Sequence, residues 1–280
     1  MENMREIVSR LAAEAANGEM VFATHAEMAL QVRRALDDPD CSLDQLAKLV
    51  RAEPLLAARV VAMANSVVYN RSGRVTTDIR QAVSSVGFKA LSNLAMALIV
   101  RQMEETSKND AHRALGARLW EHTAQVASLA YVLARRVTRQ DPDTAFFAGI
   151  VHEVGGFFLI SRAVSFPGLL DAPLQEWYRS GEVEVGRPLL KALSVPEAVV
   201  EAIEVMWNGY LTLPPESLGD TLLLAKQLAL VDSPLDMLAG EAQGEMDRSQ
   251  IDMALGEETL SGILEESAAE VAALTAALQS

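Results

Sequence analysis

The amino-acid sequence predicts an all-α protein, and three observations carry this prediction. Apolar residues recur at steps of three and four, as at Leu43, Leu46, Leu49 and Val50, and this spacing places them on one face of a helix. Sustained alternation of apolar and polar residues, which is typical of strands, is absent. Helix-start signals stand in front of several of the periodic segments. We therefore expect about a dozen helices and no sheet.

The helix-start signals are of two kinds. Ser42 precedes Gln45 by three residues, and Ser194 precedes Glu197 by three. Both pairs fit the capping box, in which two side chains satisfy the free N–H groups of the first helical turn. The Asp-Pro pair at 141–142 fits an N-cap followed by a first-turn proline. Helices are accordingly predicted to begin near these three places.

Composition limits the possible functions. The chain has 280 residues, of which 50% are hydrophobic, and a net charge of −14. Such an apolar content excludes a disordered chain, and the acidic balance speaks against nucleic acid as a partner. The single cysteine, Cys41, cannot form an internal disulfide or a thiolate zinc cluster.

The sequence also predicts a cytoplasmic protein that does not insert into a membrane. The first residues lack a basic region followed by an apolar run, so no signal peptide is expected. The longest uncharged apolar stretch, residues 94–100, is far shorter than the ~20 residues that span a bilayer.

Three regions are expected along the chain: an N-terminal helical subdomain at 1–108, a second helical subdomain at 109–232 and an acidic helical extension at 233–280. A polar stretch at 108–110 marks the first junction. Residues 241–270 hold nine acidic residues and one basic residue. This charge fits either a solvated helix face or a docking surface for a protein partner. Because its apolar seam is short, we expect the extension to pack on the main body rather than to form a coiled coil.

Most familiar catalytic motifs are missing. The sequence has no glycine-rich phosphate loop, no dinucleotide-binding fingerprint and no nucleophile elbow. It has only four histidines, at His25, His112, His122 and His152. Any hypothesis of a metal site or a general base must therefore start from these four residues.

Two of the histidines form an informative pair. His122 shares a predicted helix face with Val126 and Leu129, and His152-Glu153 follows an apolar helix at 145–151. Each histidine alone would most simply be a hydrogen-bonded core residue. Together, a helical histidine followed about thirty residues later by histidine and a carboxylate resembles the HD phosphohydrolase superfamily.

The first half of the chain sharpens this resemblance. Segments at 53–61, 64–69, 80–83 and 86–94 follow one another in an order that resembles the HDOD family, the HD-related output domains of bacterial signalling proteins. The resemblance runs from about residue 20 to about residue 229. It implies an N-terminal helical bundle packed on an HD-like helical bundle. It also implies a regulatory role in bacterial signal transduction, usually without demonstrated enzymatic activity.

Comparison with the HD metal pattern predicts a degenerate site. Active members hold metal with an H…HD…D pattern, but here Glu153 stands at the position of the first Asp and Lys226 at that of the last. A protonated lysine cannot ligate a metal ion and repels it. Further histidines of active relatives are replaced, at positions less securely aligned, by Glu182 and by Met206-Trp207. We therefore predict no catalytic residue, no metal and no cofactor.

The resemblance also raises a sharper hypothesis about Lys226. Its ammonium could replace the metal as the local positive charge and pair with Glu153, which would stabilise a buried carboxylate. The alternative is that Lys226 extends to solvent and never meets Glu153.

A second group of candidates lies where a helix is expected to end. Asn65, Ser66 and Tyr69 either cap that helix and order the following loop, or line a groove between the two bundles. Arg71 and Arg74 flank a Ser-Gly pair and form a small basic spot in an acidic protein. This spot could bind an anionic small ligand, although solvated loop arginines are the simpler interpretation.

Three functions remain open from the sequence. The first is a catalytically silent regulatory module that acts by binding other signalling proteins. The second is a metal-dependent phosphohydrolase or cyclic-dinucleotide phosphodiesterase. The third is a nucleotide-sensing domain without hydrolysis. Metal content, phosphodiester turnover and a nucleotide panel would discriminate among them.

Overall fold

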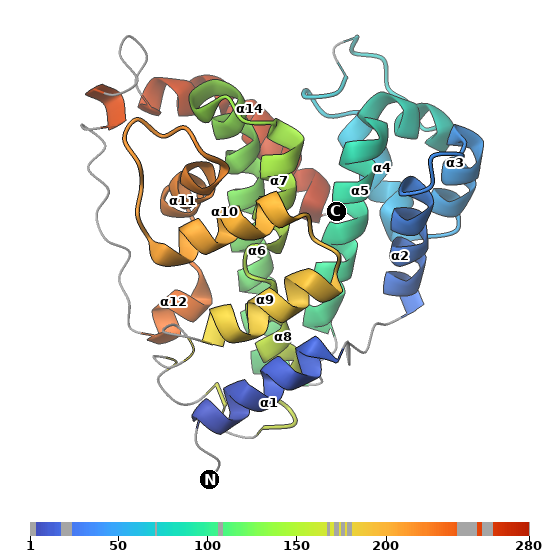
Figure 1. The fold of residues 1–280 in the computed structure, drawn as a ribbon. Helices are drawn as coiled ribbons and strands as arrows, with labels where there is room; N and C mark the ends of the chain where they lie inside the picture. Colours follow the sequence, from blue (N-terminus) through green and yellow to red (C-terminus); the bar gives the residue numbers. More distant parts are fainter. Residues whose placement is uncertain are drawn as a thin grey trace.

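The computed structural model shows an all-α fold, as predicted: its described residues form helices and contain no strand (Figure 1). The helices divide into two groups that share one long helix. We call α2–α4 with the first half of α5 the N-terminal lobe, and α6–α12 the HD-like lobe. The structure describes residues 4–17, 24–70, 72–105, 109–166, 169, 170, 174, 177, 181–239, 251–253 and 260–279.

Three short helices build the N-terminal lobe around α5. They are α2 (Thr24–Leu36), α3 (Leu43–Arg51) and α4 (Pro54–Ala64), and all three pack against α5 (Ile79–Glu105). α3 begins with the predicted capping box, in which the Ser42 hydroxyl accepts from the Gln45 N–H and the Gln45 side chain accepts from the Ser42 N–H. This lobe is therefore a bundle in which α5 is the common partner.

Helix α5 also joins the two lobes, because its later part packs against α7 and α8 of the HD-like lobe. Gly87 interrupts the helix with φ 82° and ψ 172°, a backbone conformation that is open essentially to glycine alone. A Cβ placed there would meet no atom within 4 Å. Backbone geometry, and not crowding, therefore accounts for a glycine at this kink.

The HD-like lobe is centred on the pair α6 (Asp110–Leu133) and α7 (Pro142–Val151). α7 begins as predicted, since Asp141 caps it by accepting from the Thr144 N–H. The two helices approach closely at Gly149, where a Cβ would lie 2.4 Å from the Cα of Ala127. This contact sets the separation of the two helices that carry His122 and His152.

The rest of this lobe surrounds the central pair. One sequence prediction fails here: α10 has Pro196 as its N-cap without a side-chain cap, and Ser194 adopts a left-handed conformation with φ 53°. Because Ser194 ends the preceding turn in this conformation, it cannot form a capping box with Glu197. The surrounding elements are η1, a π-helical turn (Ala134–Thr138), α8 (Val154–Arg162), α9 (Glu182–Ala192), α10 (Glu197–Asn208), α11 (Leu218–Leu228) and α12 (Pro234–Ala239).

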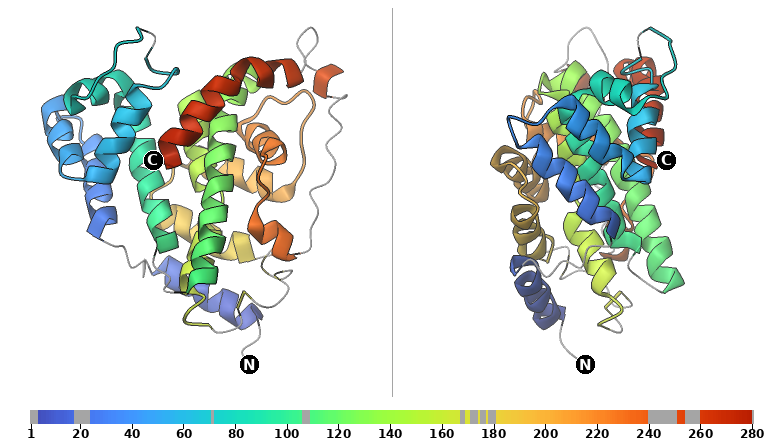
Figure 2. Two further views of the ribbon diagram at one scale, coloured as in Figure 1. Left: turned by 180° about the vertical axis from the view of Figure 1, so that it is seen from behind. Right: turned by 90° about the vertical axis from the view of Figure 1, so that its right-hand side faces the viewer.

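Two terminal helices cover the outside of the molecule. α1 (Met4–Ala16) packs against α9, so the first helix of the region predicted at 1–108 lies against the HD-like lobe. α14 (Leu260–Gln279) lies across α6 and reaches α4 (Figure 2). The C-terminal helix thus contacts both lobes.

Charged side chains hold part of α14 to the main body. Arg135 forms an ion pair with Glu270, and Nη2 of Arg136 lies 2.6 Å from Oε2 of Glu266. The predicted packing of the extension on the body is confirmed for this helix. The remainder of the acidic segment, at 241–250 and 254–259, lies outside the described residues.

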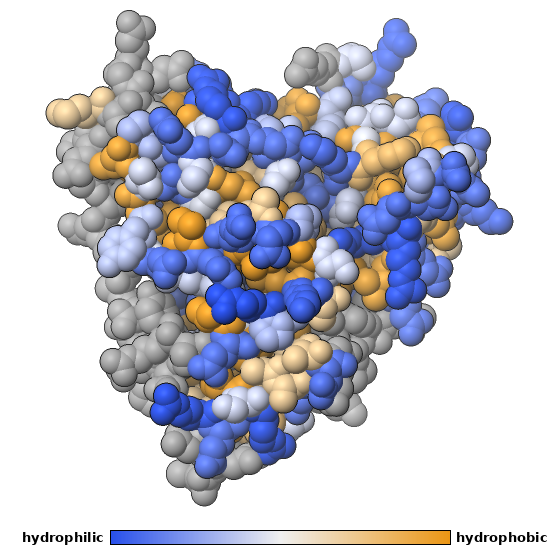
Figure 3. All heavy atoms as spheres, viewed as in Figure 1, coloured by the Kyte–Doolittle hydropathy of each residue, from blue (hydrophilic) through white to orange (hydrophobic). Residues whose placement is uncertain are grey.

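Two described segments are long and apolar enough to cross a membrane by length and composition alone. They are Ile79–Met103 and Pro142–Arg162, which are 67% and 89% buried inside the fold. Such burial is typical of core helices, so the segments are weak grounds for a membrane span. The face in Figure 3 is largely hydrophilic, with smaller apolar patches among the polar residues.

Candidate functional site

His122 enters the centre of the HD-like lobe from α6. Its side chain is fully buried, and its Nδ1 lies 2.6 Å from the carbonyl oxygen of Val231. A carbonyl oxygen only accepts, so Nδ1 carries a hydrogen and donates it. The second nitrogen, Nε2, is left without a hydrogen-bond partner among the described residues.

His152 and Glu153 meet this ring from the turn between α7 and α8. Nδ1 of His152 donates to the carbonyl of Gly149 at 2.7 Å, and the two imidazole centroids are 5.7 Å apart. Glu153 is the N-cap residue of α8 but makes no capping hydrogen bond with its side chain. The Glu153 carboxylate is turned toward the two histidines instead.

Three potential ligand atoms therefore converge in the core. Oε2 of Glu153 lies 3.9 Å from Nε2 of His122 and 4.0 Å from Nε2 of His152. The three atoms lie within 4.8 Å of one another, and none has a hydrogen-bond partner among the residues that the structure describes. We call His122, His152 and Glu153 the HD cluster.

Lys226 brings a positive charge to this cluster from α11. Its Nζ lies 3.4 Å from Oε1 of Glu153 and 3.1 Å from Oδ2 of Asp236 on α12. The Lys226 side chain is 14% exposed, so it does not extend to solvent. Of the two alternatives for Lys226, the structure therefore shows the pairing with Glu153, and Asp236 is a second partner.

Electrostatics keep Glu153 and Lys226 ionised in the core. Burial alone would raise the pKa of Glu153, but Lys226, His122 and His152 outweigh burial and lower it to about 2. Burial would lower the pKa of Lys226, but Glu153, Glu182 and Asp236 together raise it above its ordinary value. The contact between Lys226 and Glu153 is thus a buried ion pair.

The remaining titratable groups respond to the same burial. The pKa of His152 falls to about 4, chiefly because burial disfavours the charged ring. Burial raises the pKa of Asp236, and Lys226 only partly opposes this. Burial, with the carboxylates of Glu153 and Asp236, also raises the pKa of Glu182 to about 7 despite the attraction of Lys226. Glu182, which stands where active relatives carry a further histidine, is thus electrostatically linked to Glu153, Asp236 and Lys226.

The donors of the HD cluster match a divalent cation in kind. Two imidazole nitrogens and a carboxylate form a known zinc ligand set, and ligands about 2.1 Å from a metal can be about 4 Å apart. Lys226 does not match, because a protonated lysine offers no lone pair and its charge repels a divalent cation. With Lys226 bonded to Glu153, the full set of residues does not fit a bound metal ion.

The candidates after α4 have separate roles. Asn65 is the C-cap of α4, and its amide bonds the carbonyl of Val61 and both backbone groups of Thr76. Asn65 therefore orders its loop. Tyr69 does reach the other lobe, since its hydroxyl donates to Oδ1 of Asp143 at 3.2 Å. Ser66 is buried, and its hydroxyl has no partner among the described residues.

The structure does not bring the other candidates together with the HD cluster. Arg74 is exposed in the loop before α5, and Arg71 lies outside the described residues. Trp207, on α10, packs against α9 close to Gly186, where a Cβ would lie 3.1 Å from its ring. Its contact with α9 gives Trp207 a packing role.

Sequence reasoning missed two contributors to the site. Asp236 supplies the second carboxylate for Lys226, and Val231 supplies the carbonyl that orients His122. No local pattern separates Asp236 from the many other acidic residues of this region. A backbone carbonyl has no sequence signal at all, because every residue carries one.

Comparison with known proteins agrees with this architecture. Among solved structures, a candidate metal-dependent phosphohydrolase from Shewanella amazonensis SB2B shares 21% identity and a TM-score of 0.73, over 99% of this chain and 100% of the other. An HDOD domain protein of unknown function from Geobacter sulfurreducens shares 23% identity and a TM-score of 0.61, over 98% of each chain. At these identities the likeness establishes the fold alone.

One curated relative and one family model complete the comparison. An uncharacterized protein from Treponema pallidum (strain Nichols) is 22% identical over 194 residues, which are 64% of this chain and 36% of that protein. The chain thus spans about a third of that relative's length. The model of the HDOD domain matches residues 22–208, which include α2 to α10 and the HD cluster. Because this match covers most of the chain, the protein belongs to the HDOD domain family.

Proposed function

We propose that this chain is a regulatory module of bacterial signalling that works in the cytoplasm, without phosphoester hydrolysis, by binding other signalling proteins. The observation that carries the proposal is the position of Lys226. Its ammonium contacts Glu153 and Asp236 within the cluster where a hydrolase of the HD superfamily needs an open metal site.

The ion pair gives the cluster a structural role in this proposal. It joins the start of α8 to α11 and α12, while the histidines tie α6 and α7 to nearby carbonyls. Removing one member of a buried ion pair leaves an uncompensated charge, so such a cluster favours one arrangement of the helices. A fixed core of this kind suits a binding module that presents a defined surface.

A family match and one similar structure support a role in signalling. The chain belongs to the HDOD family, and a structure from Marinobacter aquaeolei VT8, described as that of a candidate signal transduction protein, shares 21% identity and a TM-score of 0.57. This chain covers 60% of that protein. Partner binding is our inference from this kinship and from the closed metal position.

Measurements of metal content and of phosphodiester turnover test whether the protein lacks hydrolase activity. The protein would be expressed with added manganese and iron and purified without chelator, and its metal content and its turnover of a general phosphodiester would be measured. We expect well under one ion per chain and no turnover above buffer. One or two tightly held ions with metal-dependent turnover would overturn the proposal.

A matched pair of variants sharpens this test. Lys226→Asp restores the carboxylate that active relatives carry, and Lys191→Asp places the same change on an exposed position of α9. We expect Lys226→Asp to bind more metal than Lys191→Asp does, because three donors already converge there. Equal metal content in both variants would show that Lys226 is not what excludes the ion.

Hydrolysis is the competing function, and one observation favours it: the Nε2 atoms of His122 and His152 face the Glu153 carboxylate and have no hydrogen-bond partner among the described residues. Genetic complementation separates the two functions in the native bacterium. A His122→Gln, His152→Gln double variant that remains folded should return a deletion strain to the wild-type phenotype if the protein acts by binding. The same variant should leave the deletion phenotype unchanged if the protein acts by catalysis.

A further inference from the structure

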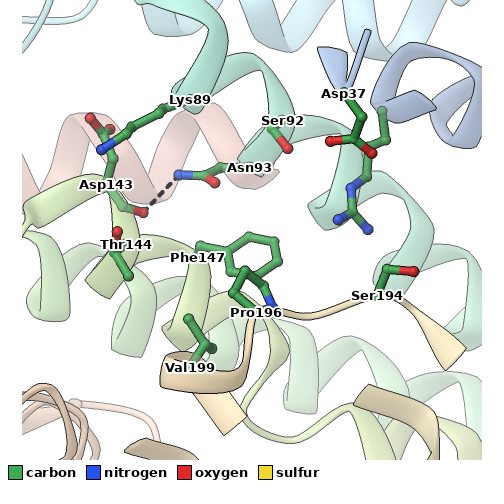
Figure 4. A pocket seen from close by; sticks show the side chains of 11 residues that line it. Asp37, Lys89, Ser92, Asn93, Asp143, Thr144, Phe147, Ser194, Pro196 and Val199 are labelled. Atoms are coloured by element: carbon green, nitrogen blue, oxygen red, sulfur yellow. Dashed lines mark hydrogen bonds between the residues drawn. The ribbon is translucent and has the colours of Figure 1, made fainter. Parts of the chain in front are cut away.

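A second site lies between the lobes, away from the HD cluster. A cleft of about 250 Å³ opens where α2 and α5 face α7 and the turn before α10 (Figure 4). Both lobes contribute side chains, and most of them are polar or charged. The cleft is lined by Arg33, Asp37, Lys89, Ser92, Asn93, Asp143, Thr144, Phe147, Ser194, Pro196 and Val199.

Arg33 supplies a cation with unused donors. Its Nη1 donates to the carbonyl of Leu193 at 2.8 Å, which is its only hydrogen bond among the described residues. Its guanidinium carbon lies 5.9 Å from the ring centre of Phe147. A guanidinium has five N–H donors in a planar fork that matches a carboxylate. Arg33 therefore retains the donors that a carboxylate ligand would use.

The charges around the cleft are balanced, which restricts the ligand. Lys89 is engaged with Asp141, at 3.1 Å from its Oδ2. Oδ1 of Asp143 accepts from the Tyr69 hydroxyl, and Lys89 is a cation near this carboxylate. Asp37 lies at the opposite end of the cleft, close to Arg33 (Figure 4). Because each end of the cleft holds one carboxylate and one cation, a doubly charged phosphate is disfavoured relative to a ligand that carries one negative and one positive charge.

Amide and apolar groups complete the lining. Nδ2 of Asn93 donates to the backbone carbonyl of Asp143 at 2.9 Å, so the amide oxygen of Asn93 is held as an acceptor. Phe147, Pro196 and Val199 form an apolar wall between the charged ends (Figure 4). A volume of about 250 Å³ suits a small metabolite and not a dinucleotide.

We propose that this cleft binds a small zwitterion with an ammonium and a carboxylate, a free α-amino acid or a dipeptide. Arg33 binds the carboxylate, while Asp143 and the Asn93 amide oxygen receive the ammonium. The apolar wall around Phe147 contacts the ligand side chain. This site and its ligand class go beyond the proposed function and do not depend on the HD cluster.

The backbone around the cleft suits a ligand that links the lobes. Ser194, in the lining, holds a left-handed conformation with φ 53°, and Gly87, with its glycine-only geometry, lies two residues before Lys89. Unusual backbone conformations of this kind are frequent at ligand clamps. Because Arg33 and Asp143 come from different lobes, a ligand that contacts both stabilises one arrangement of the lobes.

Calorimetric titration of the full chain, with chelator present, tests the site. The probes are the twenty amino acids and their glycyl dipeptides, each compared with the corresponding amine and the corresponding acid that lack one charge. We expect 1:1 binding of at least one zwitterion and loss of binding for both single-charge analogues. Absence of binding by every probe at millimolar concentration would overturn the proposal.

Two variants locate the binding. Arg33→Gln should weaken the affinity about tenfold or more, because charged hydrogen bonds are lost, whereas Arg34→Gln, at the exposed neighbour, should leave it unchanged. Arg33→Lys keeps the positive charge but loses the planar guanidinium, so its affinity for the zwitterion should lie between those of the wild type and Arg33→Gln. If Arg33→Gln does not fold, Arg33→Lys takes its place in the test. Equal affinity in Arg33→Gln would refute the assignment.

Discussion

The ammonium of Lys226 lies 3.4 Å from the carboxylate of Glu153, inside a core where the Glu153 side chain is fully buried. This contact explains how the core accommodates an ionised glutamate. A buried carboxylate needs a compensating charge, and Lys226 supplies it here.

Lys226→Met is expected to destabilise the protein by about 3–5 kcal/mol, because it leaves Glu153 and Asp236 without a cation. Urea unfolding measures the change. Lys191→Met, at an exposed position on α9, should stay within about 0.5 kcal/mol of the wild type. Equal stability of the two variants would mean that the buried pair contributes nothing.

The pair should also show coupling in a double-mutant cycle. Glu153→Gln alone leaves Lys226 bonded to Asp236, so we expect it to cost less than Lys226→Met. The double variant should be about 1–3 kcal/mol more stable than the sum of the single effects predicts. Strict additivity would contradict a direct interaction.

Glu182→Gln should reveal the raised pKa of Glu182. Between its ordinary value of 4.5 and about 7, the folded protein binds a proton that the unfolded chain has released. Wild-type stability is therefore lost as the pH rises through this window, while a glutamine does not titrate. The variant should gain about 2–3 kcal/mol relative to the wild type between pH 4.5 and pH 8, as measured by urea unfolding at each pH.

A control for this profile is Glu184→Gln, an exposed position on the same helix. The same measurement on this variant gives the effect of replacing an exposed glutamate of this helix. A flat difference for Glu182→Gln would show that Lys226 neutralises Glu182 completely.

Gly149→Ala tests the contact that sets the spacing of α6 and α7. The added methyl group would lie 2.4 Å from the Cα of Ala127, so the helices must separate. We expect a loss of about 3 kcal/mol or more in the free energy of unfolding. Ala127→Gly in the same chain should not rescue it, since the clash is with the backbone. Full rescue would show that only the Ala127 methyl group is in the way.

Gly87→Ala separates backbone strain from crowding in α5. No atom lies within 4 Å of the added Cβ, so any cost arises from φ 82° and ψ 172°. We expect about 1–3 kcal/mol of destabilisation by thermal unfolding. Gly209→Asn is the comparison, because φ 71° and ψ 15° at that helix end suit asparagine. If both variants cost the same small amount, the kink in α5 is not strained.

The sequence by itself determined the helical class and several local boundaries. The cap at Ser42 and the Asp-Pro start at 141–142 formed as predicted, because these signals act within one turn of the chain. Ser194 did not, since its turn before α10 is a left-handed one that the local pattern does not encode. The resemblance to the HD and HDOD families, through the order of motifs along the chain, also brought His122, His152, Glu153 and Lys226 together as candidates.

Only the tertiary structure decided which groups share a volume of space. Asp236 reaches Lys226 from a separate helix, and the carbonyl of Val231 fixes the His122 ring through a contact between distant segments that no residue type specifies. The cleft at Arg33 likewise exists only because two lobes meet there. Local signals depend on neighbours within a few residues, whereas these sites depend on packing between distant segments. The physical reason is that burial and charge compensation are properties of the assembled core and not of any one segment.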